Sequence, residues 1–199
     1  MRWLVKHLVA WLLVAIASVG YVAYLLHLEV PPAVRPAVEA AAEVLTRSAS
    51  SVAPAGGEPT WASVLRVASL ILANNIRVEL LSAAPFLGAA AYPLSLTVTA
   101  WVLKVVATAR FGERWLEVAT GVLRAPHTYL ELLAYSIVFV EGCVATYHLV
   151  RRGDIPEDHV RRYAVSLLLS LAVLTAAALV EAYGLFRFHD YLFCLFALV

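Results

Sequence analysis

The sequence predicts an all-α protein, a polytopic transmembrane helical bundle of about five spans followed by an apolar interfacial segment at the C-terminus. Of its 199 residues, 62% are hydrophobic and 15% are charged, whereas a soluble domain carries roughly 25% charged residues. Apolar runs of about 20 residues, long enough to cross the hydrocarbon of a bilayer, recur along the chain. Basic residues cluster at the edges of these runs, as is typical of membrane proteins.

The first predicted element is a transmembrane anchor over residues 1–28. Residues 8–28 contain no Lys, Arg, Asp or Glu, and Arg2 and Lys6 precede them. This apolar run exceeds the roughly 7–15 residues of a signal-peptide core, and no small-residue cleavage motif follows it closely. We therefore expect a retained helix in the cell membrane, with its N-terminus in the cytoplasm.

The second predicted element is an extramembrane linker over residues 29–60, with prolines near its start and prolines and glycines near its end. Charges recur at every fourth position, at Arg35, Glu39, Glu43 and Arg47. This spacing places them one helical turn apart and allows i,i+4 charge pairs. A short surface helix, serving as a stalk or lying at the interface, is the simplest interpretation. A docking element for a partner is the alternative.

The third predicted unit is a membrane domain over residues 61–199. Its last part, residues 185–199, is apolar but too short to cross again. An amphipathic stretch at 110–124 and a hinge at 151–162, with seven charged residues, interrupt the apolar sequence. The four further spans are expected over residues 61–84, 86–109, 126–150 and 163–183.

The basic residues between the spans do not fix the orientation of the chain. With the N-terminus inside, the four arginines of the hinge at 151–162 fall on the cytoplasmic side, as the positive-inside rule expects. The same orientation places Lys104, Arg110, Arg114 and Arg124 outside. An interfacial or re-entrant path for residues 110–124 would reconcile the two observations.

Polar residues within the second predicted span are candidates for a functional or structural centre. A charged side chain in the middle of a bilayer costs about 2.5–3.5 kcal/mol on insertion scales. This span contains Asn74, Asn75, Arg77 and Glu79. Arg77 and Glu79 are two positions apart, or about 200° around a helix, so they cannot neutralise each other well. Each charge therefore needs a partner from another span.

Three acidic residues in later spans are the candidate partners of Arg77: Glu131, Glu141 and Glu181. An ion pair inside the bundle would tie the second span to the fourth or the fifth. Removing the guanidinium would then leave a carboxylate alone in a medium of low dielectric constant. The sequence thus predicts that Arg77→Ala destabilises the bundle by about 3–5 kcal/mol.

The fourth span begins with Pro126, which costs no hydrogen bond in the first turn of a helix. His127 and Glu131 follow on one face, one turn apart. A structural lock at the helix end, a site that handles protons or ions, and a catalytic pair are the three interpretations. Two ligands are too few for a zinc site, and we expect no metal and no cofactor.

One face of the fifth span combines small residues with a carboxyl group. Ser170, Leu174, Ala177, Ala178 and Glu181 recur at helical spacing. Small residues allow membrane helices to approach closely. We therefore expect a tight helix pair that holds Glu181 inside the bundle.

Three stretches resemble the stage II sporulation protein M-like family of integral membrane proteins. They are the Asn-containing residues 72–75, the Pro-His…Glu element at 126–131 and residues 177–182. Their order and spacing agree with that family over about residues 61–184. Two features depart from the family pattern. Thr128 replaces the usual glycine after Pro-His, and an Asn-Gly pair is missing from residues 96–101.

The resemblance implies a membrane component that is not an enzyme. The sporulation member of the family works in a membrane complex with secreted wall-degrading enzymes. We expect a scaffold or complex subunit that organises membrane or envelope partners, with the polar residues bonding helix to helix. A permease-like transport subunit, with a polar path through spans two, four and five, is the alternative. An intramembrane hydrolase using His127 and Glu131 is the third hypothesis.

The expected partners follow from composition and from this resemblance. They are the lipid bilayer, together with protein partners or further copies of the chain. An ATPase would suit the transport hypothesis, and an envelope enzyme would suit the scaffold. The net charge of +1, without a stripe of basic residues, gives no reason to expect nucleic acid.

Overall fold

The computed structural model describes residues 2–52 and 60–187, and the regular structure of these residues is entirely helical. The predicted all-α class is therefore confirmed. Most of the predicted C-terminal interfacial segment, residues 188–199, lies outside the described residues. The elements are α1 (Arg2–His27), α2 (Arg35–Val52), α3 (Trp61–Ala83), α4 (Gly88–Phe111), the 3-10 turn η1 (Gly112–Arg114), α5 (Trp115–Arg124), α6 (Pro126–Arg152) and α7 (Glu157–Arg187).

Local sequence signals set several helix ends. Thr60 and Ser63 form a reciprocal capping box at the start of α3, in which each hydroxyl accepts a hydrogen bond from the backbone N–H of the other residue. Pro126 occupies the first turn of α6, as its sequence position predicts. Gly153 ends α6 with a φ of 76°, a left-handed conformation that glycine adopts without a steric cost.

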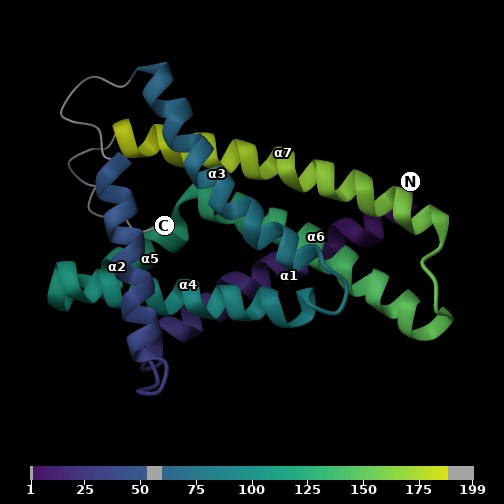
Figure 1. Ribbon diagram of the computed structural model, residues 1–199, viewed down its shortest axis with the longest axis horizontal. Coiled ribbons are helices and arrows are strands. Elements are labelled where there is room, and N and C mark those ends of the chain that lie inside the picture. Colours follow the sequence, from purple (N-terminus) through teal and green to yellow (C-terminus); the bar gives the residue numbers. More distant parts are fainter. Residues whose placement is uncertain (1, 53–59, 188–199) are drawn as a thin grey trace.

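The five long helices α1, α3, α4, α6 and α7 run alternately in opposite directions along the long axis of the molecule (Figure 1). Two side-chain hydrogen bonds fix the relation of α1 to α4. Ser18 bonds with Tyr92 at 2.7 Å, and Tyr21 bonds with Thr97 at 2.9 Å. Because the residue numbers rise together in both helices, α1 and α4 are parallel. Between them, α3 carries the chain back along the bundle.

Four segments are long and apolar enough to cross a membrane, which supports a multi-pass membrane protein. The prediction of five spans is not confirmed by this criterion. The predicted span that fails is α3, whose apolar character is reduced by two asparagines and three charged residues. The four segments are Lys6–His27, Gly88–Arg124, Pro126–Arg152 and Glu157–Leu185.

Small residues bring α3, α6 and α7 close to one another. Ala177 and Ala178 are buried, and the hydroxyl of Ser170 donates a hydrogen bond to the carbonyl of Ala134 on α6 at 2.9 Å. Gly142 of α6 lies against the backbone at the end of α3, where a Cβ atom would be only 2.6 Å from the carbonyl oxygen of Ala83. Close backbone approach is the usual packing mode of membrane helices.

The linker at 29–60 contains α2, which lies across α4 at one end of the bundle (Figure 1). Val38 and Ala42, one turn apart, are both buried. Glu39 and Glu43 remain exposed. This helix is therefore amphipathic, with its apolar side covered by the bundle.

Candidate functional site

The structure divides the eight polar residues singled out in the spans into an inward and an outward group. The inward group provides carboxyl, amide and imidazole side chains from α3, α6 and α7. Asn75, Glu79, His127, Glu141 and Glu181 are buried, Glu131 is partly exposed, and Asn74 and Arg77 are exposed.

The expected ion pair between Arg77 and an interior carboxylate is not formed. Arg77 is exposed on α3, and within residues 2–52 and 60–187 it makes no ion pair. The reason is the angle of about 200° that separates it from Glu79 around the helix. Because Glu79 faces inward, Arg77 has to face outward. The interior carboxyl groups therefore receive no arginine from α3.

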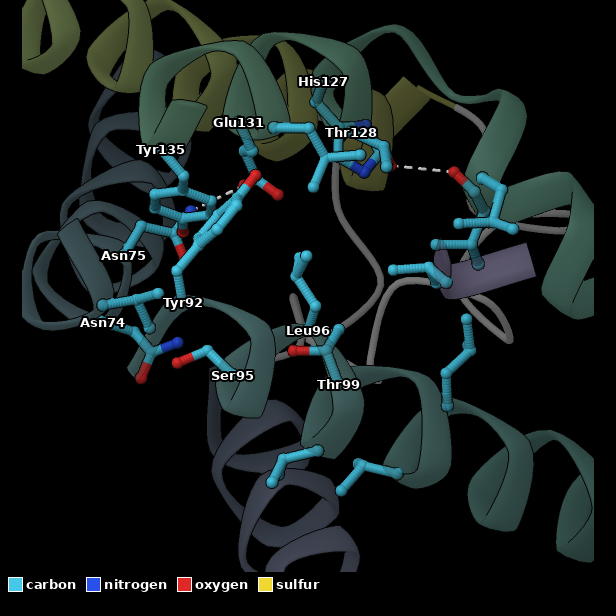
Figure 2. A pocket seen from close by; sticks show the side chains of 18 of the residues that line it. Asn74, Asn75, Tyr92, Ser95, Leu96, Thr99, His127, Thr128, Glu131 and Tyr135 are labelled. Atoms are coloured by element: carbon cyan, nitrogen blue, oxygen red, sulfur yellow. Dashed lines mark hydrogen bonds between the residues drawn. The ribbon is translucent and has the colours of Figure 1, made fainter. Parts of the chain in front are cut away.

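The centre of the candidate site is a contact between Asn75 of α3 and Glu131 of α6. The side-chain amide of Asn75 donates a hydrogen bond to Oε1 of Glu131 at 2.6 Å. Figure 2 shows the second carboxyl oxygen of Glu131 pointing into the open space between the helices. An amide is neutral, so this hydrogen bond holds the carboxyl group in place without balancing its charge.

A cavity of about 170 Å³ lies beside Glu131, with its walls formed mainly by α3, α4, α5 and α6. Polar side chains from α3, α4 and α6 line one part of it, including Asn75, Tyr92 and His127 (Figure 2). The rest of the lining is mostly aliphatic. The main apolar lining residues are Leu96, Leu103, Val122, Leu123 and Leu132.

The cavity reaches the surface of the chain between α3 and α4. Three of its lining residues, Asn74, Val98 and Thr99, are themselves exposed. They lie well inside their helices, away from the ends. A ligand can therefore enter from the side of the bundle.

Two further carboxyl groups belong to the same electrostatic cluster as Glu131. The phenol of Tyr135 interacts electrostatically with Glu131, Glu181 and Glu79, and Glu131 also interacts with Glu181. Glu79 is 3% exposed and Glu181 is 1% exposed. Among the described residues, Oε1 of Glu79 and Oε2 of Glu181 have no hydrogen-bond partner. In the part of the chain that the structure describes, these acidic groups from α3, α6 and α7 form no ion pair with a Lys or Arg.

A second polar centre lies farther along α6 and joins α1 to it. His7 Nδ1 is 2.5 Å from Oε1 of Glu141, whose side chain is almost fully buried. His159 of α7 also interacts with this carboxyl group, and its ring lies 5.3 Å from that of His148. His7 could not be selected from the sequence, because it lies at the edge of the first apolar run, distant in sequence from its partner.

The donor groups of the site limit its chemistry. His127 and Glu131 both line the cavity on successive turns of α6. No group of three or more His, Cys, Asp or Glu side chains in the described part of the chain is arranged to hold a metal ion. The site therefore provides one carboxyl oxygen directed into the cavity, further hydrogen-bonding side chains and an apolar wall.

The three stretches that resemble the stage II sporulation protein M-like family meet at this site. Asn75 of the first stretch bonds to Glu131 of the second, and Glu181 of the third interacts with Glu131. No protein-family model, curated protein or solved structure matches the chain. Membership of that family therefore stays a prediction that rests on these stretches.

Proposed function

We propose that this chain is an integral membrane subunit that is not an enzyme and that organises membrane or envelope partners as a scaffold. The observation that carries this proposal is the α6–α7 hairpin, which extends past the turn between α3 and α4 (Figure 1). The resemblance to the stage II sporulation protein M-like family supports the same role.

The extent of the hairpin follows from two hydrogen bonds. Thr146 of α6 accepts a bond from the backbone N–H of Phe86 at 2.8 Å, and Tyr163 of α7 donates one to the carbonyl of Ala83 at 2.5 Å. These bonds place the α3–α4 turn level with Thr146 and Tyr163. From there α6 continues six residues to Arg152, or about 9 Å at the rise of an α-helix.

The projecting hairpin exposes both apolar and charged side chains. Tyr147, Val150 and Val160 are 59%, 70% and 53% exposed. Arg151 and Arg152 are exposed beside them. Apolar anchors with a charged rim are typical of a protein–protein contact. This surface is available to a partner because it does not hold the five long helices together.

We further propose that α3 crosses the membrane as a fifth span, although it is the one long helix that is not among the four segments apolar enough to cross by length and composition. Both α1 and α4 are apolar enough to cross, and they are parallel. Two consecutive crossings in the same direction require a return crossing between them, and α3 provides it. With the N-terminus in the cytoplasm, the arginines of the α6–α7 hairpin also lie inside, which agrees with the positive-inside rule.

The topology is tested with single cysteines in a variant that lacks Cys143 and Cys194. Thr60→Cys and Phe86→Cys flank α3, and we expect a membrane-impermeant thiol reagent to label them from opposite sides of the membrane. Val160→Cys reports on the hairpin and should be labelled from the same side as Phe86→Cys. Labelling of Thr60→Cys and Phe86→Cys from one side would show that α3 does not cross.

The scaffold role is tested by purifying the tagged chain from its native membrane. We expect a partner to co-purify in a fixed ratio with the wild type and to be lost with the double variant Val150→Glu, Val160→Glu. Glu113→Lys is the matched control, because Glu113 is exposed at the opposite end of the bundle. A wild-type chain that purifies without a partner, or a partner retained by the double variant, would contradict the proposal.

A transport subunit is the second candidate, and the cavity beside Glu131 specifically favours it. The predicted polar path is nevertheless divided, because Glu141 lies ten residues along α6 from Glu131, or about 15 Å. Loss of ion-coupled transport in reconstituted vesicles with Glu131→Gln, but not with Glu117→Gln, would favour transport. Equal transport by both variants would count against it.

A further inference from the structure

We propose that the cavity beside Glu131 binds a small organic cation, an ammonium group attached to an apolar body. This inference goes beyond the scaffold role and does not depend on it, because the cavity lies away from the projecting hairpin. It rests on four features of the cavity: its size, its unbalanced carboxyl group, its aromatic residues and its apolar remainder.

The size of the cavity suits a small organic molecule. Its volume is about 170 Å³, and an apolar protein cavity of about 150 Å³ is large enough to take up benzene. The exposed mouth at Asn74, Val98 and Thr99 gives such a molecule a way in.

The charge of the cavity favours a cation. One oxygen of Glu131 is held by Asn75, and the other points into the space (Figure 2). His127 lines the cavity, whereas two basic side chains of the neighbouring helices α3 and α4 are directed elsewhere. Arg77 is on the exposed side of α3, and the ammonium of Lys104 donates a hydrogen bond to the carbonyl of Leu28 and lies over the Trp115 ring.

The groups behind the cavity wall strengthen this preference. Glu79 of α3 and Glu181 of α7 interact with Tyr135, which itself lines the cavity. Each of these two buried carboxyl groups has one oxygen without a hydrogen-bond partner in the described structure. A bound cation would stabilise the ionised form of Glu131 beside these two acidic groups.

The aromatic and aliphatic lining selects an organic cation over a metal ion. Tyr92 and Tyr135 line the cavity beside Glu131, and aromatic rings attract ammonium groups through their negative faces. The hydroxyl of Tyr92 bonds with Ser18 at 2.7 Å and Ser136 at 3.2 Å, which holds its ring in position. A hard metal ion would need several oxygen ligands, which the aliphatic remainder of the wall does not supply.

The ammonium group can come from two sources. One is a free organic cation, and the other is the headgroup of a phospholipid that carries choline or ethanolamine. Both share the chemistry that the cavity recognises. A mouth on the side of a membrane bundle is accessible to either source, so the experiment has to separate them.

The test uses the purified full-length chain in detergent, with choline chloride as the probe and 3,3-dimethyl-1-butanol, its neutral isostere, as the control ligand. We expect choline at tenfold its Kd to raise the midpoint of thermal unfolding by about 3–6 °C. The isostere should bind at least about tenfold more weakly, because it cannot pair with the carboxylate or make a cation–π contact. Equal binding of the two would overturn the proposal.

Substitutions of residues that line the cavity test whether choline binds beside Glu131. Glu131→Gln keeps an acceptor for Asn75 but removes the charge, and we expect it to weaken choline binding about tenfold. Glu117→Gln is the matched control, since Glu117 is exposed and paired with Arg114 at 3.1 Å, and it should bind as the wild type does. If Glu131→Gln does not fold, Leu123→Phe keeps the carboxyl group and narrows the cavity. Unchanged choline affinity in the folded cavity variant would overturn the proposal.

Lipid nanodiscs separate the two sources. We compare discs of phosphatidylglycerol alone with discs that also contain phosphatidylcholine. Loss of soluble choline binding in the mixed discs identifies the lipid headgroup as the occupant, and retained binding identifies a free cation. Absence of choline binding in detergent and in both kinds of disc would overturn the proposal.

Discussion

Two carboxyl groups on α6 differ sharply in their surroundings. Glu141 is fully buried, and its side chain pairs with His7 of α1 at 2.5 Å. Glu131 bonds to the neutral amide of Asn75 and keeps one oxygen directed into a cavity (Figure 2). The two groups have the same chemistry and lie on the same helix. They differ in whether another helix supplies a titratable base.

This difference separates a structural role from a binding role. A buried acid that pairs with a basic side chain of another helix links the two helices. Removing the acid leaves the basic side chain without its partner. A partly buried acid with a neutral partner still requires a positive charge or a proton. Glu141 therefore suits the first role and Glu131 the second. Substitutions at these two groups and in the helices around them test this contrast.

The largest expected effect is that of Glu141→Ala. The substitution leaves His7 without its carboxyl partner and opens space in the core, so we expect a loss of about 3 kcal/mol in unfolding free energy. Thermal or denaturant unfolding in detergent measures it. Cys143→Ala is the control, because Cys143 is exposed two positions away. Equal stability of the two variants would show that Glu141 does not join α1 to α6.

The next largest effect is expected for Gly142→Ala, beside Glu141. The added Cβ would lie 2.6 Å from the carbonyl oxygen of Ala83, so α3 and α6 would have to separate, at a cost of about 1–3 kcal/mol. Gly20→Ala meets no atom within 4 Å and should gain up to about 1 kcal/mol of helix propensity. The same unfolding measurement compares them, and equal destabilisation of both would contradict the close α3–α6 contact.

A smaller effect is expected for Glu131→Gln in the absence of ligand. The new amide oxygen can accept the hydrogen bond from Asn75, and no basic partner is lost, so the change should stay below about 1 kcal/mol. Glu141→Gln is the matched comparison, because it weakens the pair with His7 and should cost more. If the two variants are equally destabilised in unfolding experiments, the contrast between the two carboxyl groups fails.

The smallest effect is expected for Arg77→Ala. Arg77 is exposed and forms no ion pair with a described residue, so the stability should change by no more than about 0.5 kcal/mol. This outcome is the reverse of the sequence-based expectation of a large loss. A measured loss near 3 kcal/mol would restore the interior pair that the sequence predicts.

The sequence identified most of the candidate site but not its connections. Asn75, Glu131 and Glu181 could be selected from the sequence because polar side chains within membrane-spanning segments are energetically unfavourable and therefore rare. The direction of Arg77 could not be read from the run itself. Helical geometry separates Arg77 from Glu79, but only packing against α6 and α7 determines which of the two faces inward.

The sequence by itself determined the helical class, the bounds of most helices and the small-residue face of α7. These properties depend on composition, periodicity and residues close together in the chain. The tertiary structure alone decided that Asn75 meets Glu131, that His7 meets Glu141, and that a cavity remains beside one carboxyl group. These outcomes depend on the rotation and separation of helices far apart in sequence, and no local pattern encodes that geometry.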